Sequence, residues 1–212
     1  MDKEMKGLSL LLATMGMALL LSAGVAFADT FDCIAGRACT GTNGPDTLKG
    51  SADSDYMDAR QDDDELFGNE GHDSISGDAF DAPDNDTSTD GNDLLKDGPG
   101  FDELVGYGGA DELSGGDNGD SIFAEESSEN NGEDVASGGR GNDFILARDG
   151  VKDTINCGKG NTDVVFFDKG GVDTVANNCE YKNQFPEEQL SRSASFATEK
   201  VNAEKVNALR AR

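Results

Sequence analysis

The chain has 212 residues, with 28 Gly, 43 Asp and Glu and 17 Lys and Arg, so its formal net charge is −26. This charge excludes a typical nucleic-acid-binding surface, which needs clustered Lys and Arg to neutralise phosphates. Only 35% of the residues are hydrophobic and none is Trp, which is low for a globular domain. We therefore do not expect a large conventional core, and a bound cation is the most available source of the missing stability.

The first 28 residues have the features of a secretory signal peptide. An apolar run, Leu8–Leu21, precedes Ala26-Phe27-Ala28, the small-x-small pattern that signal peptidases cleave. The run is too short to span a bilayer, and a start at Met5 would give it a positively charged N-terminal region. We predict cleavage after Ala28 and secretion of the remaining chain, with an uncleaved membrane anchor as the alternative.

Four Cys residues flank the acidic region of the chain, which fits an exported protein. Cys33 and Cys39 lie at its N-terminal end, and Cys157 and Cys179 lie at its C-terminal end. Proximity along the chain favours the pairs Cys33–Cys39 and Cys157–Cys179, while the other two pairings and free thiols remain open. No CxxC pair supports a zinc site. We expect residues 29–40 to form a Cys-containing N-terminal cap.

Asp recurs at a fixed period through the acidic region, which indicates an internal repeat. The spacing is nine residues in Asp46, Asp55, Asp64 and Asp73, in Asp93, Asp102, Asp111 and Asp120, and in Asp134 and Asp143, and it is ten in Asp153, Asp163 and Asp173. An apolar residue follows two positions after each of these Asp residues, Ala136 being the exception, and a Gly-rich turn precedes many of them. So regular a spacing over this length is not expected by chance.

These residues resemble the RTX, or haemolysin-type, calcium-binding repeats, whose pattern is GGxGxDxUx. The resemblance covers about Gly41 to Val175 and is clearest at Gly138-Gly139-Arg140-Gly141-Asn142-Asp143. It implies an all-β fold, a parallel β-roll or β-solenoid in which each nonapeptide is one turn and one strand and two make a coil. The flanking Cys pairs are similar to those of small secreted bacterial proteins built only of such repeats. We assign residues 41–181 to this roll.

The resemblance also implies which residues bind the metal. The ligand Asp corresponds to Asp46, Asp55, Asp73, Asp93, Asp102, Asp111, Asp120, Asp134 and Asp143, and the turn Gly to Gly106, Gly108, Gly115 and Gly138. Asp64 fits less well because its turn has no Gly, and the ten-residue repeats are expected to cap the roll. We expect a repeat at Gly77–Ala82 that has lost its Asp, followed by an insertion of two residues before Asp93. A second insertion of five is expected within Ala124–Asn131.

The repulsion between stacked carboxylates also favours Ca²⁺. Residues eighteen apart would stack along one side of the roll, and neighbouring strands lie about 4.8 Å apart. Stacked carboxylates such as Asp102 and Asp120 would repel each other by roughly 3 kcal/mol at an effective dielectric constant of about 20. Ca²⁺ accepts about six to eight oxygen ligands in a flexible cage, whereas Mg²⁺ demands stricter geometry. Several Ca²⁺ ions are therefore the predicted cofactors.

One other metal motif overlaps this pattern. Asp86–Gly91 is similar to the start of an EF-hand loop, with Asp97 at the twelfth position, although Asp93 stands where such loops carry an apolar residue. A solvated acidic insertion is the simpler interpretation. Either interpretation leads to the same ion.

Catalysis finds little support in the sequence. The single His, His72, lies in a turn and is expected to face solvent, and there is no zinc-protease motif, nucleophile elbow or phosphate loop. We predict a secreted calcium-binding protein that folds on binding Ca²⁺ and has a structural or adhesive role. A secreted hydrolase on a β-solenoid scaffold is the alternative. The expected partner is a component of the cell surface or wall, with no nucleic acid and no transmembrane segment in the mature chain.

The last 31 residues differ sharply in composition from the roll. Residues 182–212 contain six Lys and Arg, four Glu, and no Asp or Gly, whereas residues 29–181 contain nine Lys and Arg against 37 Asp and Glu. Apolar residues from Leu190 to Leu209 are spaced too irregularly for a strong helical face. Two alternatives remain open for this segment. It forms a helix that folds against the roll or contacts a wall polymer, or it is a disordered tail.

Overall fold

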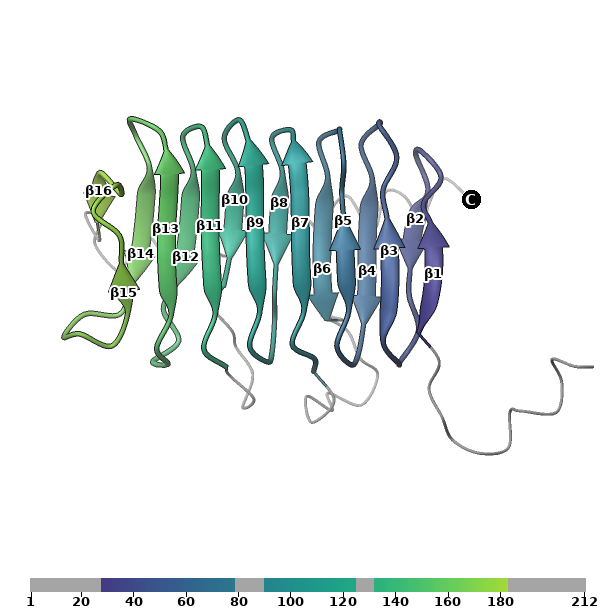
Figure 1. The fold of residues 1–212 in the computed structure, drawn as a ribbon, viewed down its shortest axis with the longest axis horizontal. Coiled ribbons are helices and arrows are strands. Elements are labelled where there is room, and N and C mark those ends of the chain that lie inside the picture. The colour runs from purple at the N-terminus through teal and green to yellow at the C-terminus, as the bar shows by residue number, and fades with distance from the viewer. Residues whose placement is uncertain (1–27, 79–89, 125–131, 183–212) are drawn as a thin grey trace, which may run out of the picture.

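The computed structural model describes residues 28–78, 90–124 and 132–182, and the predicted signal peptide and nearly all of the C-terminal tail lie outside them. Within these ranges the regular structure consists of sixteen β-strands, and no helix able to span a membrane is found there. Successive strands alternate between two eight-stranded sheets, so the chain winds as a flat solenoid (Figure 1). The predicted parallel β-roll is confirmed.

Each sheet takes every second strand of the chain, and all the pairings are parallel. Sheet A contains β1 (Asp29–Asp32), β3 (Asp46–Lys49), β5 (Glu65–Phe67), β7 (Leu94–Pro99), β9 (Glu112–Asp117), β11 (Val135–Arg140), β13 (Thr154–Lys159) and β15 (Thr174–Val175). Sheet B contains β2 (Ala38–Thr40), β4 (Tyr56–Arg60), β6 (Ser74–Asp78), β8 (Glu103–Val105), β10 (Ser121–Phe123), β12 (Phe144–Ala147), β14 (Val164–Phe167) and β16 (Tyr181–Lys182). One edge of the roll therefore carries the A-to-B turns and the other carries the B-to-A turns.

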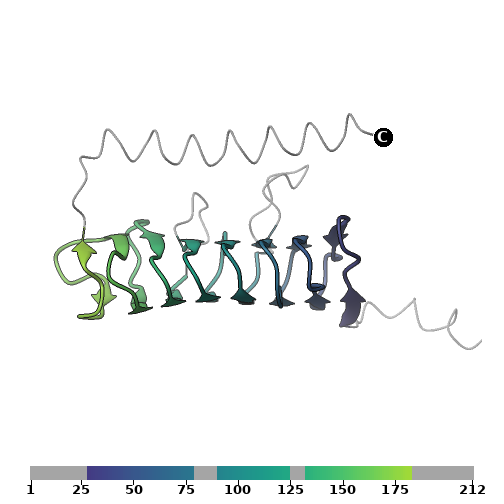
Figure 2. The same cartoon turned by 90° about the horizontal axis from the view of Figure 1, so that it is seen from above.

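The core is a thin seam between the two sheets, as the view from above shows (Figure 2). Nearly every strand places one apolar side chain in this seam, two residues after the repeating Asp, and parallel register stacks these side chains in rows. The sheet A row includes Leu48, Leu66, Leu95, Leu113, Ala136 and Ile155, and the sheet B row includes Met57, Ile75, Leu104, Ile122, Ile145 and Val165, all at most 1% exposed. A seam one side chain deep per strand confirms the expected thin interior.

Disulfides close both ends of the roll, and the two pairs favoured by proximity are confirmed. Cys33–Cys39 links the chain after β1 to β2, and Cys157–Cys179 links β13 to the segment before β16. The residues predicted to form an N-terminal cap thus supply the first strand of each sheet. Each bond holds a terminal coil where neighbouring strands are missing on one side.

The break between Asp73 and Asp93 differs from the prediction. β5 pairs with β7 in the register Leu66↔Leu95, so the coil that starts at Asp64 is 29 residues long instead of 18. The prediction of a degraded repeat at Gly77–Ala82 was therefore wrong: there is one insertion of eleven residues. With a degraded repeat, the strand after Asp93 would lie in sheet B. Instead Leu95 pairs with Leu66 in sheet A.

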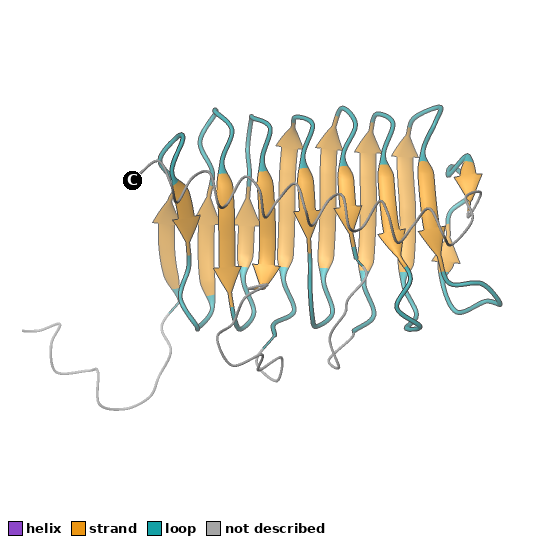
Figure 3. Ribbon diagram, turned by 180° about the vertical axis from the view of Figure 1, so that it is seen from behind, coloured by secondary structure: helices purple, strands orange, loops and turns teal. Residues whose placement is uncertain are grey.

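The second insertion lies where it was expected, between Asp120 and Asp134. It lengthens the coils that contain it to 23 residues. It joins β10 to β11, and the first insertion joins β6 to β7, so both occur in B-to-A turns (Figure 3). The A-to-B edge is free of insertions between Asp55 and Asp143.

The turn before Asp64 keeps the repeat geometry without any Gly. Arg60 has φ 97° and Asp62 has φ 74°, in the left-handed region that Gly adopts elsewhere, as at Gly116 with φ 113°. A non-Gly residue held in this region costs on the order of 1–3 kcal/mol. The register of the surrounding strands overrides the local preference of these residues.

The Arg60→Gly variant is expected to be more stable than the wild type by about 1 kcal/mol, because Gly adopts this φ without strain and gives back part of the gain as chain entropy. Urea unfolding at saturating calcium measures the difference. Arg140→Gly is the control, since Arg140 also ends a strand, β11, but has a negative φ, and this variant should not gain stability. A loss of stability in Arg60→Gly would contradict the assignment of strain.

Candidate metal sites along the two edges

The repeating Asp residues form two columns, one along each edge of the roll. The B-to-A column contains Asp46, Asp64, Asp93, Asp111, Asp134, Asp153 and Asp173, and the A-to-B column contains Asp55, Asp73, Asp102, Asp120, Asp143 and Asp163, with Glu180 at its end. All nine predicted ligand Asp residues therefore lie in these columns. Each stands between a turn and the strand that follows it.

Backbone hydrogen bonds fix every carboxylate in its column. The N–H of each Asp donates to one carboxylate oxygen of the Asp in the next coil, as in Asp93 to Asp111 at 2.8 Å and Asp102 to Asp120 at 3.0 Å. The B-to-A series is unbroken from the N–H of Asp29 to Asp173, and the other runs from Asp55 to Glu180. In the folded roll, one oxygen of the column carboxylates is therefore held by a backbone donor.

The second oxygen of most of these carboxylates is buried without a donor. Oδ2 receives no hydrogen bond from any described residue in Asp64, Asp73, Asp93, Asp102, Asp111, Asp120, Asp134, Asp143, Asp153 and Asp163, all at most 4% exposed. Buried polar atoms normally have a partner, and an unpaired one costs free energy. A row of unpaired carboxylate oxygens is the donor set that Ca²⁺ accepts, so the residues fit this ion.

Three of the predicted turn glycines make room for these oxygens. Gly106, Gly115 and Gly138 each stand five residues before an Asp, and a Cβ at any of them would collide with Oδ2 of that Asp. Gly108 differs, because its Cβ would meet the side chain of Asp90. The Gly-rich turns are thus required by the position of the carboxylates as well as by turn conformation.

Burial raises the pKa of many column carboxylates, which favours their protonated form. Burial, and to a smaller extent the neighbouring carboxylates, raise the pKa of Asp93 to about 9 and that of Asp120 to about 8. The pKa values of Asp102 and Asp143 rise to about 6. Protons and calcium ions therefore compete for the same oxygens.

Asp64, Asp153 and Asp163 were not among the metal ligands predicted from the sequence, although all three belong to the columns. Asp64 has the same geometry as the others, and it stacks on Asp93, not on the position of Ala82. Its nine-residue spacing was the correct signal, and the missing Gly was misleading because Arg60 and Asp62 adopt the turn conformation. Asp153 and Asp163 also continue the columns despite the longer repeats.

The structure does not favour the EF-hand alternative. Asp93 belongs to the B-to-A column, and Asp97 lies on β7 with its side chain buried inside the roll. Residues 86–89 of the motif lie outside the described residues. The signal for Asp97 in the sequence was its position five residues before Asp102, where the neighbouring repeats carry Gly.

The comparisons with known proteins agree with this geometry. The RTX calcium-binding nonapeptide repeat, in four copies, matches residues 40–79, 87–122 and 130–164. Neither the curated proteins nor the solved structures gave a match. The matched ranges contain both columns from Asp46 to Asp163.

Calcium binding is expected to release protons and to become tighter as the pH rises from about 6 to about 9, the range of the raised pKa values. These values lie above the ordinary 3.8, so the metal-free roll is most stable below about pH 4 and loses stability through this range. Calcium binds the deprotonated form. Isothermal titration calorimetry in two buffers of different ionisation enthalpy counts the protons released. A calcium affinity that does not change with pH would contradict the raised pKa values of these carboxylates.

Proposed function

Because this chain belongs to the RTX calcium-binding nonapeptide repeat family, we propose that it is a secreted protein whose roll folds when Ca²⁺ binds between stacked turns. The observation that carries the proposal is the row of buried Oδ2 atoms without a donor along each edge. Each Ca²⁺ would take carboxylate oxygens from successive coils and carbonyl oxygens from the Gly-rich turns.

The A-to-B edge is the stronger calcium-binding edge in this proposal. Its column has no insertion from Asp55 to Asp143, and Gly115 and Gly138 leave space for the carboxylates. The B-to-A column offers Asp46, Asp93, Asp111 and Asp134, with Gly106 and Gly108 in one turn, but both insertions fall among its turns. Ions on the first edge can therefore form one continuous row.

Calcium would supply the free energy that the thin seam lacks. Residues 29–181 carry 37 acidic residues against nine basic ones, and the apolar contribution is about one side chain per strand. If free calcium exceeds the dissociation constant of a site a hundredfold, that site adds about 2.7 kcal/mol of stability. Five such sites would add roughly 13 kcal/mol, comparable to the stability of an ordinary domain.

Export completes the proposal. The two disulfides are typical of an oxidising compartment, and residues 1–28 would be removed as a signal peptide. A chain that stays loose where calcium is scarce can be secreted and then fold outside the cell.

We assign the folded protein a structural or adhesive role at a cell surface or wall, not a catalytic one. His72 is exposed and accepts a hydrogen bond from the N–H of Phe101 through Nδ1 at 2.9 Å. The Phe101 ring lies 5.6 Å from the His72 ring. Both contacts support a turn-stabilising role for the only His. No observation favours the hydrolase alternative.

The Asp120→Asn variant is expected to lose calcium affinity at one site and about 2–3 kcal/mol of calcium-dependent stability, because it removes a charge from the middle of the A-to-B column. Equilibrium dialysis counts the ions bound, and urea unfolding at fixed calcium measures the stability. Asp117→Asn is the matched control, since Asp117 ends β9 three residues before Asp120 but is exposed and pairs with Arg140 at 3.7 Å. A wild-type chain that takes up no calcium would refute the proposed function.

A further inference from the structure

Asp97 stands where the neighbouring turns carry Gly. The strand pairs Lys96↔Ser114 and Gly98↔Gly116 align Asp97 with Gly115, and Phe67↔Lys96 places it next to Gly68. Gly50, Gly68, Gly115 and Gly138 hold this position in the other A-to-B turns before Asp55, Asp73, Asp120 and Asp143. Asp97 therefore adds a carboxylate that the repeat pattern does not contain.

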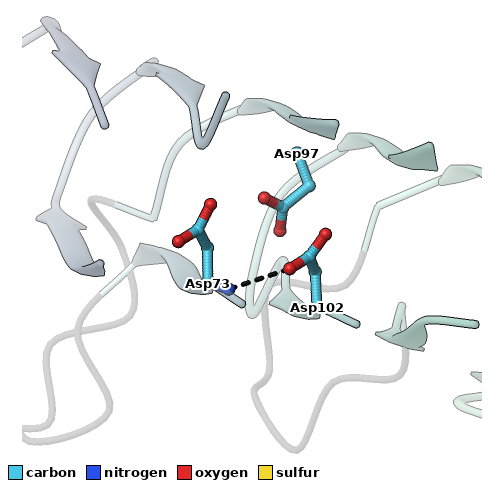
Figure 4. A group of neighbouring side chains, drawn as sticks. All are labelled: Asp73, Asp97 and Asp102. Carbon is cyan, nitrogen blue, oxygen red and sulfur yellow. Dashed lines mark hydrogen bonds between the residues drawn. The ribbon is translucent and has the colours of Figure 1, made fainter. Parts of the chain in front are cut away.

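The Asp97 carboxylate is buried and unpaired. The residue is 5% exposed, and neither carboxylate oxygen receives a hydrogen bond from any described residue. A Cβ at Gly68 would collide with Asp97 Oδ1, so Gly68 leaves the space that this side chain occupies. Asp97 points into the roll towards Asp73 and Asp102 (Figure 4).

These three carboxylates are close enough to hold one cation. Asp73, Asp97 and Asp102 each offer a carboxylate oxygen, and the three oxygens lie within 4.8 Å of one another. Calcium–oxygen distances of about 2.4 Å allow opposite ligands of one ion to be up to about 4.8 Å apart. Oδ2 of Asp73 and Oδ2 of Asp102 are also buried without a donor, so all three residues have an oxygen available.

We propose that Asp73, Asp97 and Asp102 form a three-carboxylate calcium site that binds its ion more tightly than the sites of the regular repeats and fills first. The extra ligand charge is the reason, because affinity for Ca²⁺ rises with the number of charged ligands. This inference rests on the proposed function, since it requires that the roll bind calcium.

The position of the site gives it a role in assembly. Asp73 precedes β6, Asp97 lies on β7 and Asp102 precedes β8, so the ion connects the last strand before the eleven-residue insertion to the two strands after it. The coil from Asp73 to Asp102 has 29 residues, and closing a longer loop costs more chain entropy. The additional carboxylate therefore strengthens cation binding at the coil whose closure costs the most chain entropy.

The test uses the chain from residue 29 to 212 and three variants. Asp97→Gly restores the residue that the neighbouring coils carry, and Asp97→Asn keeps the shape of the side chain. Asp117→Asn is the control, because it removes one exposed charge at the end of β9 in the next coil. Calcium titration calorimetry, with Tb³⁺ luminescence as a second probe, measures the tightest dissociation constant. Urea unfolding at two fixed calcium concentrations measures how much stability each variant gains from calcium.

Both Asp97 variants are expected to weaken the tightest site by about tenfold or more, while Asp117→Asn leaves it unchanged. Asp97→Gly should also gain less stability than the wild type from the same rise in calcium concentration, which a purely structural role would not produce. A tightest site with the wild-type affinity in both Asp97 variants would overturn this inference alone. A wild-type chain that binds no calcium would overturn the proposed function as well.

Discussion

The whole roll is organised around one repeated interaction, the hydrogen bond from the backbone N–H of one Asp to the carboxylate of the Asp in the next coil. This bond fixes one carboxylate oxygen and leaves the other buried without a donor. The parallel register, the Gly five residues before the Asp and the apolar side chain two residues after it all follow from keeping this arrangement in phase. The same bond brings like charges together, so the fold requires a counter-ion or protons.

The two columns explain how so small an apolar seam could define a unique structure. Leu104 and Ile122 stack in register and exclude water, but they supply only one side chain per strand. In our proposal the ions supply the rest, and because each ion joins two coils, binding at one level positions the next. The disulfides then hold the two end coils, which have a neighbour on one side only.

Much of this arrangement could be predicted from the sequence, because a period of nine residues with an apolar residue at a fixed offset leaves few ways to wind a chain. The rows and the columns follow from it, and the two disulfides are those that proximity along the chain favoured. The insertion before Asp93 was misjudged because spacing along the chain does not show which sheet a strand joins. Asp64 was discounted because turn glycines are a preference that strand register can override, as Arg60 shows. In the sequence Asp97 stood out only as the twelfth position of an EF-hand-like loop, since only the packing of three coils reveals its neighbours.

Far-ultraviolet circular dichroism of the chain from residue 29 to 212, first in chelator and then with millimolar calcium, tests the central claim most directly. The account predicts a largely unfolded spectrum in chelator at pH 9, where most of the column carboxylates, such as Asp102 and Asp120, have lost their protons, and a strand spectrum once calcium is added. A strand spectrum already complete in chelator and unchanged by calcium would contradict it.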